Sequence, residues 1–326
     1  MRALAGLILA AVLLAVAFPA PASADGSGTA LPARADVGPM RHIWQTWNNC
    51  GPAAVVMALS TLGITGDQEV ARLALRGPDI RRGMGPGPVD PWVQELYGLR
   101  SVSRMNGTVE MMKSLVANGF APMVTQWMQD PSVSRIAHWR TVRGYDDAQG
   151  AFFVNDPMLG NNVALSYEWF NDNWQAFSYR WMVIYDPKDE QRLQQVIGRD
   201  WVESDMRDAF YARAKADAQT QNTSAAWLTY GEAAYQDGWF YEAVQAFERG
   251  MSMGSANGVF TVRGSYPAAL RAIGRLGDAD QSAARLATTA STPATVITSP
   301  DSFARILAAR RSWTADVIHP DAGLTF

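Results

Sequence analysis

The sequence of 326 residues has a single cysteine, Cys50, and only three histidines. One cysteine excludes an internal disulfide. Three histidines scattered along the chain do not give the ligand spacing of a metal site, so no metal and no cofactor are expected. Basic charge is not in excess either, with 28 Lys and Arg against 31 Asp and Glu. That balance argues against a nucleic-acid-binding protein.

Long hydrophobic runs are also missing, except at the start of the chain. Residues 3–18 are apolar with few interruptions, and the small residues Ala22-Ser23-Ala24 follow. A short apolar run that ends in a small-x-small site is typical of a secretory signal peptide rather than a membrane span. We therefore expect residues 1–24 to be a signal peptide that is cleaved after Ala24. The mature chain is then secreted or extracytoplasmic, with no stable membrane insertion.

The mature length of about 300 residues favours two domains. Composition changes along the chain and divides it into segments. The expected segments are a Gly-, Ala- and Pro-rich linker at 25–39, a mixed domain at 40–189, a helical region at 190–290, and a tail at 291–326 with one helix at 302–311.

Within residues 40–189, helical spacing of apolar residues comes first and strand patterns follow. Helices are expected from Cys50 to Gly63, from Asp67 onward, at 91–97, from Thr108 to Gly119 and at 169–174; strands are expected at 122–127, 138–144, 151–155 and 179–185. In the second helix, Val70, Leu73 and Ala74 should form the buried face. Helices followed by antiparallel strands predict an α+β fold.

The surroundings of Cys50 favour a reactive thiol over a buried inert one. An apolar run begins directly after it, Asn48 or Asn49 can cap a helix there, and Pro52 is tolerated in a first turn. Cys50 should therefore lie at the positive end of a helix, where the thiolate is favoured and the pKa of the thiol falls. A thiolate in that place is a nucleophile.

The base that serves Cys50 is expected to be His138. His319 lies in the tail, and His42 is only eight residues before the cysteine. Asp156 follows His138 by eighteen residues, at the end of the next predicted strand. The start of one strand neighbours the end of the next in an antiparallel pair, so the two side chains can meet as a base and the carboxylate that orients it.

A third polar side chain, Gln45, precedes the predicted helix by five residues. Its amide can point to the same place as the backbone N–H of Cys50. Together the two donors would form an oxyanion hole.

At these residues the chain resembles the C39-like cysteine peptidases, a branch of the papain-like superfamily. The similar motifs, within about residues 40–187, are Gln45, Asn49-Cys50-Gly51-Pro52-Ala53, His138 with Gly144-Tyr145-Asp146, Asn155-Asp156-Pro157, and the late helix from Phe170 to Trp174. The resemblance implies Cys50 as nucleophile, His138 as general base and acid, Asp156 as its orienter, and Gln45 as oxyanion donor. Two departures are the loop-like Asp130-Pro131-Ser132 and the lack of a transporter membrane region, so the substrate does not carry over.

The region 190–290 resembles the tetratricopeptide pattern. Its spacing is carried by Trp227, Gly231, Ala243 and Phe247, with a degenerate second copy at 268–278. Each such repeat is a helical hairpin, and an array of them holds extended peptides. We expect a separable helical unit that binds a partner or a protein substrate. The alternative is an ordinary helical hairpin packed on the first domain.

The function predicted from the sequence is a secreted cysteine peptidase that works through a thioester on Cys50. A papain-like acyl transferase or amidase uses the same intermediate, and the sequence does not separate the two. The third hypothesis is a non-catalytic protein-binding module built on the helical repeats. The presence of Cys50, His138, Asp156 and Gln45 argues against it. The expected partners are a peptide or protein substrate and a protein bound by the helical region.

Overall fold

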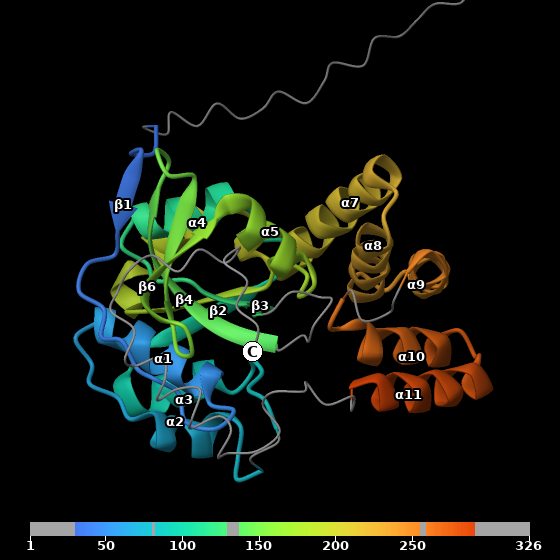
Figure 1. The fold of residues 1–326 in the computed structure, drawn as a ribbon, viewed down its shortest axis with the longest axis horizontal. Coiled ribbons are helices and arrows are strands. Elements are labelled where there is room, and N and C mark those ends of the chain that lie inside the picture. Colours follow the sequence, from blue (N-terminus) through green and yellow to red (C-terminus); the bar gives the residue numbers. More distant parts are fainter. Residues whose placement is uncertain (1–29, 80–81, 129–136, 255–258, 291–326) are drawn as a thin grey trace, which may run out of the picture. The chain divides into compact units, whose positions relative to one another are not determined.

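The computed structural model describes residues 30–79, 82–128, 137–254 and 259–290 (Figure 1). The predicted signal peptide, the loop-like segment 130–132 and the predicted helix at 302–311 lie outside these ranges. The first part of the chain contains β1 (Arg34–Asp36), α1 (Cys50–Thr61), α2 (Gln68–Leu75), α3 (Val89–Tyr97), β2 (Arg100–Arg104), α4 (Val109–Ala117), β3 (Met123–Trp127), β4 (Ala137–Asp146), β5 (Ala151–Asp156), β6 (Gly160–Ser166), α5 (Tyr167–Gln175) and β7 (Trp181–Tyr185).

These strands form one seven-stranded antiparallel sheet in the order β2-β7-β3-β4-β5-β6, with β1 paired to β4. The long strand β4 organises the sheet. Along one edge, its first half pairs with β3 and its last residues pair with β1, while β5 lies along the other edge. The predicted α+β class is confirmed.

Helices cover both faces of this sheet (Figure 1). The central strands β3 and β7 are buried at every position. Successive residues in a strand point to opposite faces. Met123 and Met182 therefore belong to the hydrophobic cluster that includes α1, while Val124 and Val183 belong to the cluster that includes α4 and α5. Burial on both faces explains why these strands are apolar runs rather than alternating patterns.

Three strands were not predicted. β1 lies inside the segment expected to be a linker, and it pairs Arg34 with Asp146. β2 has the sequence Arg-Ser-Val-Ser-Arg, in which only Val102 is buried, and β6 carries two exposed asparagines. Each of these strands lies at a margin of the sheet, where polar residues hide the strand pattern.

The predicted buried face of α2 is wrong. Val70 and Leu73 are 54% and 57% exposed, whereas Ala71 and Leu75 are buried in the cluster around α1. The side chain of Asp67 caps this helix by accepting hydrogen bonds from the N–H groups of Glu69 and Val70. A helix of only eight residues has few apolar positions. Their spacing alone did not identify the face that packs against α1.

The last part of the described chain is helical. It contains the 3-10 turns η1 (Pro187–Asp189) and η2 (Gly198–Trp201) and the helices α6 (Glu190–Ile197), α7 (Glu203–Gln221), α8 (Ser224–Gln236), α9 (Phe240–Met253), α10 (Val262–Ala272) and α11 (Leu276–Ala290). None of the helices within the described ranges is long and apolar enough to cross a membrane.

Helices α8 and α9 form a tight hairpin. A Cβ atom at Gly231 would lie 2.5 Å from a ring carbon of Phe247, and one at Gly250 would lie 2.8 Å from Cγ of Leu228. Both glycines therefore allow the two helices to approach closely. Trp227 is only partly buried, and the guanidinium of Arg249 lies 4.4 Å from its ring. The identity of this hairpin as a tetratricopeptide repeat stays a prediction.

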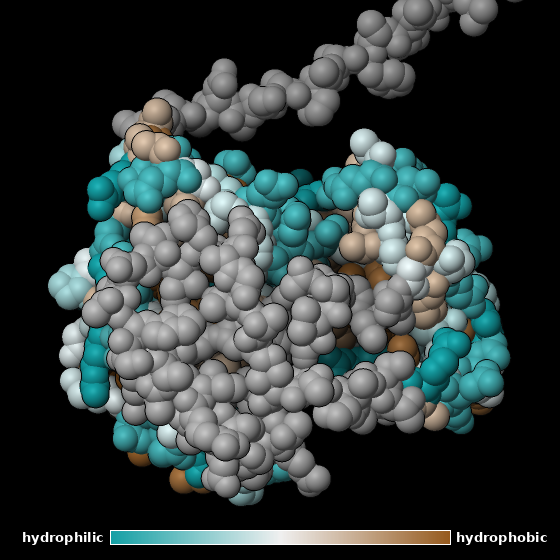
Figure 2. All heavy atoms as spheres, viewed as in Figure 1, coloured by the Kyte–Doolittle hydropathy of each residue, from teal (hydrophilic) through white to brown (hydrophobic). Residues whose placement is uncertain are grey.

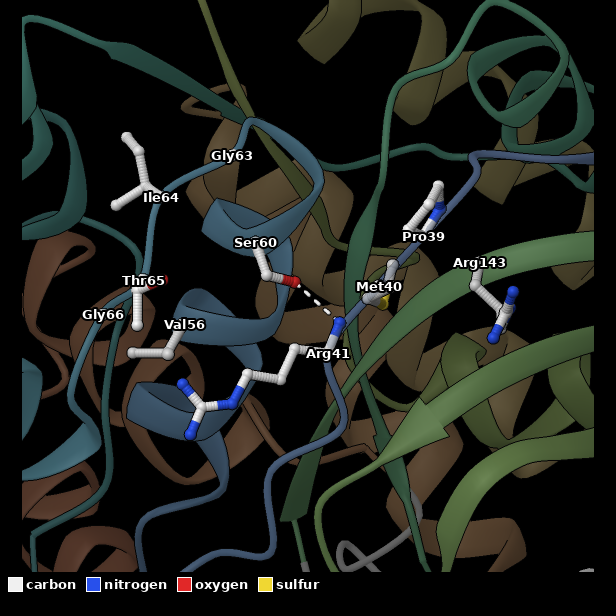
Figure 3. A pocket seen from close by; sticks show the side chains of 10 residues that line it. All are labelled: Pro39, Met40, Arg41, Val56, Ser60, Gly63, Ile64, Thr65, Gly66 and Arg143. Atoms are coloured by element: carbon white, nitrogen blue, oxygen red, sulfur yellow. Dashed lines mark hydrogen bonds between the residues drawn. The ribbon is translucent and has the colours of Figure 1, made fainter.

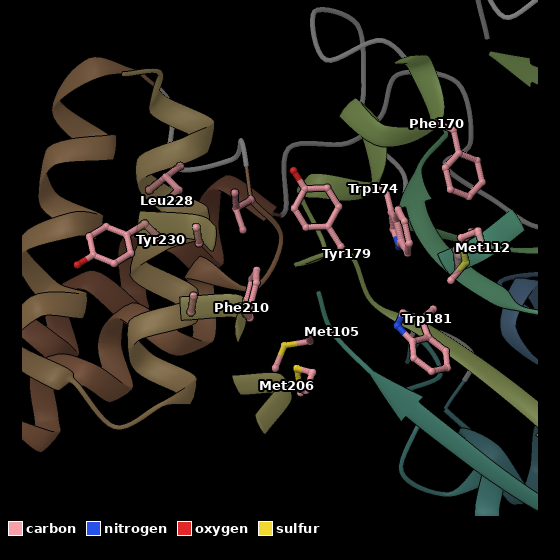
Figure 4. Packing of buried hydrophobic residues seen from close by; sticks show 14 of the residues in the cluster. Met105, Met112, Phe170, Trp174, Tyr179, Trp181, Met206, Phe210, Leu228 and Tyr230 are labelled. Atoms are coloured by element: carbon pink, nitrogen blue, oxygen red, sulfur yellow. The ribbon is translucent and has the colours of Figure 1, made fainter. Parts of the chain in front are cut away.

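The helical region and the sheet share one hydrophobic cluster. Met105 and Tyr179 of the sheet domain and Met206 and Phe210 of α7 are all members of it (Figure 4). Arg213 of α7 adds polar contacts, because its guanidinium lies 4.1 Å from the ring of Tyr179 and donates to the backbone of residues 106 and 107. These contacts join α7 to the sheet domain. The expectation that residues 190–290 form a separable unit stays a prediction.

Candidate active site

Cys50 is the first residue of α1, as predicted, and Asn49 occupies the N-cap position. The side chain of Asn49 does not cap the helix. Its Nδ2 donates instead to Thr46 Oγ1 at 2.6 Å and to Glu69 Oε1 at 2.9 Å. The N–H groups of the first turn are therefore left for other acceptors, and the Cys50 thiol accepts from the N–H of Gly51.

His138 and Asp156 meet at one end of the β4–β5 pair. Thr141 lies opposite Asn155 in the register, which brings the first residues of β4 to the end of β5. His138 Nε2 lies 2.8 Å from Asp156 Oδ1. The Cys50 thiol is hydrogen-bonded to the same imidazole, for which Nδ1 is the remaining nitrogen. The structure thus joins the three predicted residues in one hydrogen-bonded chain.

Asp156 is held by four donors. Its Oδ1 accepts from His138 and from the N–H groups of Met158 and Leu159, at 2.7 and 2.8 Å, and its Oδ2 accepts from Arg140 Nε at 2.6 Å. Burial alone would raise the pKa of this carboxyl, but the charges of His138 and Arg140 and the hydrogen bonds outweigh it. The pKa of Asp156 is held well below its usual range, so the carboxylate stays ionised.

The pKa values of Cys50 and His138, the two groups that lead to this carboxylate, are shifted in opposite directions. Burial would raise the pKa of Cys50, but the hydrogen bond and charge of His138 and the N–H groups of Trp139 and Gly51 lower it overall. Burial would lower the pKa of His138, but the charge and hydrogen bond of Asp156, followed by those of Cys50, raise it overall. Both shifts favour a thiolate beside an imidazolium.

Gln45 lies in the segment before α1 and contacts the turn that follows Asp156. Its backbone N–H donates to Pro157 O at 2.9 Å, and its side chain is 4% exposed. Its Oε1 is a buried atom with no hydrogen-bond partner among the residues that the structure describes. His42, which is not the base expected from the sequence, lies in the same segment as Gln45. Its Nε2 is 2.9 Å from Asp156 O.

Arg140 is a residue of this site that sequence reasoning missed. It is two positions after His138 on β4, so both side chains leave the same face of the strand. It is fully buried, and its Nη1 also donates to Gln126 Oε1 at 3.1 Å. Gln126 in turn donates to Phe170 O on α5 at 2.7 Å. The signal available in the sequence was an arginine between the apolar residues Trp139 and Val142 of a predicted strand.

A pocket of about 510 Å³ lies elsewhere, beside α1 and the loop that follows it (Figure 3). Its lining includes Arg41, Ser60 and Arg143, and Arg41 N donates to Ser60 Oγ at 2.9 Å. None of the four predicted site residues lines it. Within the described ranges, no group of three or more His, Cys, Asp and Glu is placed to hold a metal ion.

Comparison with known proteins identifies the segment that carries this site. Residues 36–187 match the model of the Peptidase_C39 like family. The chain carries a C39-like peptidase domain. This confirms the resemblance stated for residues 40–187 and the papain-like class of the fold. The C39-like domain thus contains Cys50, His138, Asp156 and Gln45, and α7–α11 follow it.

Two solved structures are similar to the C39-like domain. One is a C39-like peptidase from Bacillus anthracis, with 15% identity, a TM-score of 0.40 and coverage of 46% of this chain and 96% of that chain. The other is a double-glycine-motif protease from an AMS/PCAT transporter in complex with the leader peptide, with 20% identity, a TM-score of 0.35 and coverage of 45% and 91%. No curated protein sequence matches the chain.

Proposed function

We propose that this chain is a cysteine peptidase that hydrolyses peptide bonds through a thioester on Cys50. The observation that carries the proposal is the buried hydrogen-bonded chain from Cys50 through His138 to Asp156. The family of the domain supports the same chemistry. We infer the roles of Cys50, His138 and Asp156 from their contacts and that of Gln45 from the resemblance to the family.

In the resting site, Cys50 is a thiolate and His138 an imidazolium. The thiolate sulfur attacks the carbonyl carbon of the scissile peptide, and the carbonyl π bond breaks to leave a negative oxygen. The side-chain amide of Gln45 and the N–H of Cys50 donate to that oxygen. Donors that are held in position before the reaction stabilise the charge as it develops, and this is the role we propose for the two groups.

Collapse of this intermediate breaks the C–N bond. His138 gives its proton from Nδ1 to the leaving amine, and Cys50 is left acylated. Water then attacks the thioester while His138 takes one of its protons. Release of the acid restores the thiolate and the imidazolium. Throughout, Asp156 keeps Nε2 protonated and the ring in one orientation.

The test is digestion of a peptide library by the mature full chain. We expect cleavage at a defined set of sites, which is lost in the Cys50→Ala variant. Products that join two library peptides, with no free acid released, would instead identify an acyl transferase. Equal cleavage by the chain and its Cys50→Ala variant would overturn the proposal.

We also propose that the protein is exported and that helices α8–α11 bind a protein partner or substrate. Export is supported by the apolar run at 3–18 and the Ala22-Ser23-Ala24 site. The intact mass of material from the culture medium tests it, and a soluble cytoplasmic product that retains Met1 would overturn it. In Figure 2 the visible surface of the helical region carries hydrophilic residues with apolar residues between them.

A further inference from the structure

The side chain of Gln68 binds the backbone on both sides of Gln45. Its Nε2 donates to Trp44 O at 2.9 Å, and its Oε1 accepts from the N–H of Thr46 at 2.9 Å. One primary amide thus makes two hydrogen bonds to the carbonyl and the N–H that flank Gln45. A neighbouring strand would make the same pair of bonds, but here a single side chain supplies both.

A third bond fixes this segment from another element. The N–H of Gln45 itself donates to Pro157 O at 2.9 Å. Gln45 is therefore held between the first turn of α2 and the turn that follows β5, the strand that ends at Asp156. Backbone bonds before, at and after one residue leave its Cα–Cβ direction little freedom. The Gln45 amide is buried, so its direction matters for any group it contacts.

Gln68 is well placed to act as an anchor because its own backbone is fixed. It is the first residue of α2, directly after the capping residue Asp67. The neighbouring Glu69 accepts from Thr46 Oγ1 at 2.6 Å and from Asn49 Nδ2 at 2.9 Å, and the charge of Arg72 holds that carboxylate from the other side. The first turn of α2 thus holds the segment from Trp44 to Asn49.

We propose that Gln68 is a positioning residue that aims the amide of Gln45 at the oxyanion of the acyl-transfer step. The inference rests on the proposed function, because it needs Gln45 in the oxyanion hole. The two hydrogen bonds of the Gln68 side chain go to the backbone of residues 44 and 46 and not to the Cys50 thiol or the His138 imidazole, so Gln68 should act through Gln45 alone.

If Gln68 acts through Gln45, its removal should affect one reaction of the Cys50 thiol and not another. Acylation of Cys50 by 4-nitrophenyl acetate forms a C–S bond, passes through a negative oxygen and expels 4-nitrophenolate. Alkylation by iodoacetamide displaces iodide from a saturated carbon and never forms an oxyanion. A residue that positions Gln45 should affect the first reaction and leave the second unchanged. A residue that merely supports the start of α1 should affect both.

The experiment measures both rates in the full mature chain and in Gln68→Ala, Gln45→Ala and the double variant. Gln94→Ala, which removes an exposed glutamine of α3, is the matched control, and the rate of Cys50→Ala is subtracted as background. We expect Gln68→Ala to slow acylation about tenfold or more, because small misplacement of a catalytic group is costly. Alkylation should be unchanged, and Gln94→Ala should match the parent chain. The double variant should equal Gln45→Ala, since the two residues act as one unit.

Each other outcome overturns the inference. If Gln45→Ala slows acylation but Gln68→Ala does not, only the inference on Gln68 fails. If Gln68→Ala slows both reactions equally, or its effect adds in full to that of Gln45→Ala, Gln68 has a structural role. If Gln45→Ala leaves acylation unchanged, the oxyanion role of Gln45 fails as well, and a Cys50 that neither reagent modifies contradicts the proposed function itself.

Discussion

The ion pairs at the end of the sheet beside Cys50 are buried, whereas those of the helical region are at least partly exposed. At the sheet end, His138, Arg140 and Asp156 are at most 1% exposed and are bonded to one another. In the helical region, an ion pair such as Arg271–Asp280 has side chains that are 49% and 77% exposed. Exposed pairs of this kind contribute about 0–1 kcal/mol. Buried charges cost several kcal/mol each to desolvate unless they are fully paired.

The difference supports the proposal that the sheet end beside Cys50 is the reactive part of the molecule. A fold gains little stability from a buried charged cluster compared with apolar packing. The α8–α9 hairpin packs mainly through apolar contacts, with Gly231 and Gly250 giving close contacts to Phe247 and Leu228. Its buried carboxyl Glu232 accepts from the amide of Gln236 rather than from a charged partner. The sheet end departs from the rule around the proposed thiolate–imidazolium pair. The predictions below test whether this contrast is real.

The largest effect is expected from Cys50→Ser. Turnover of any peptide substrate should fall by at least about 10⁴-fold, because His138 is matched to a thiol and not to a hydroxyl of much higher pKa. The midpoint of thermal unfolding should change little, since the two side chains have nearly the same shape. Steady-state kinetics and a thermal melt check both points. Retained turnover would remove Cys50 from the mechanism.

Arg140→Met tests the contribution of the buried ion pair between Arg140 and Asp156. Removing one partner of a buried ion pair should lower the free energy of unfolding by about 3–5 kcal/mol, because Asp156 loses its Oδ2 donor in a place that water does not reach. Arg271→Met in α10 is the matched control, with an expected loss of no more than about 1 kcal/mol. Urea denaturation of the two variants measures the difference. Equal losses would erase the contrast between the two regions.

Phe247→Ala tests the apolar packing of the helical region. The variant leaves a cavity against Gly231 and should lower the free energy of unfolding by about 3–5 kcal/mol. The iodoacetamide rate of Cys50 below the unfolding transition should stay that of the parent chain, because Phe247 has no part in the chemistry. A slower thiol in the folded variant would show that the helices shape the site.

Gln45→Ala should have a smaller but specific effect. We expect kcat to fall by about 10²-fold with little change in KM, because the amide acts mainly on charge that develops in the transition state. The kinetics of the best substrate from the library digest give both constants. A change in KM alone would make Gln45 a substrate-binding residue instead.

The sequence predicted the parts of the fold that are governed by apolar residues. The helix with the buried Met112, Leu115 and Val116, and the strands β3 and β7, follow from local patterns. The margin strands β1, β2 and β6 carry too few buried residues to show such a pattern. The exposed Val70 and Leu73 show the reverse error, in which apolar residues were assigned to the core.

The site divides in a similar way. Cys50, His138 and Asp156 could be found because cysteine and histidine are rare in this chain and the strand order brings the last two together. Arg140 and Gln68 could not be found by spacing. The role of Arg140 depends on the register of β4 with β5, and that of Gln68 on where α2 packs against the segment 44–46.

The central claim is that Cys50 and His138 form a thiolate–imidazolium pair. The rate of Cys50 alkylation by iodoacetamide across pH tests it most directly. A lowered pKa of Cys50 means that thiolate persists as the pH falls below the ordinary thiol range, and a raised pKa of His138 means that its charge persists above the ordinary histidine range. The account predicts fast labelling near pH 6, far above that of the same chain unfolded in urea, where the thiol titrates near an ordinary value of about 8.5. A folded protein whose labelling follows that ordinary titration, or is slower than it throughout, would contradict the account.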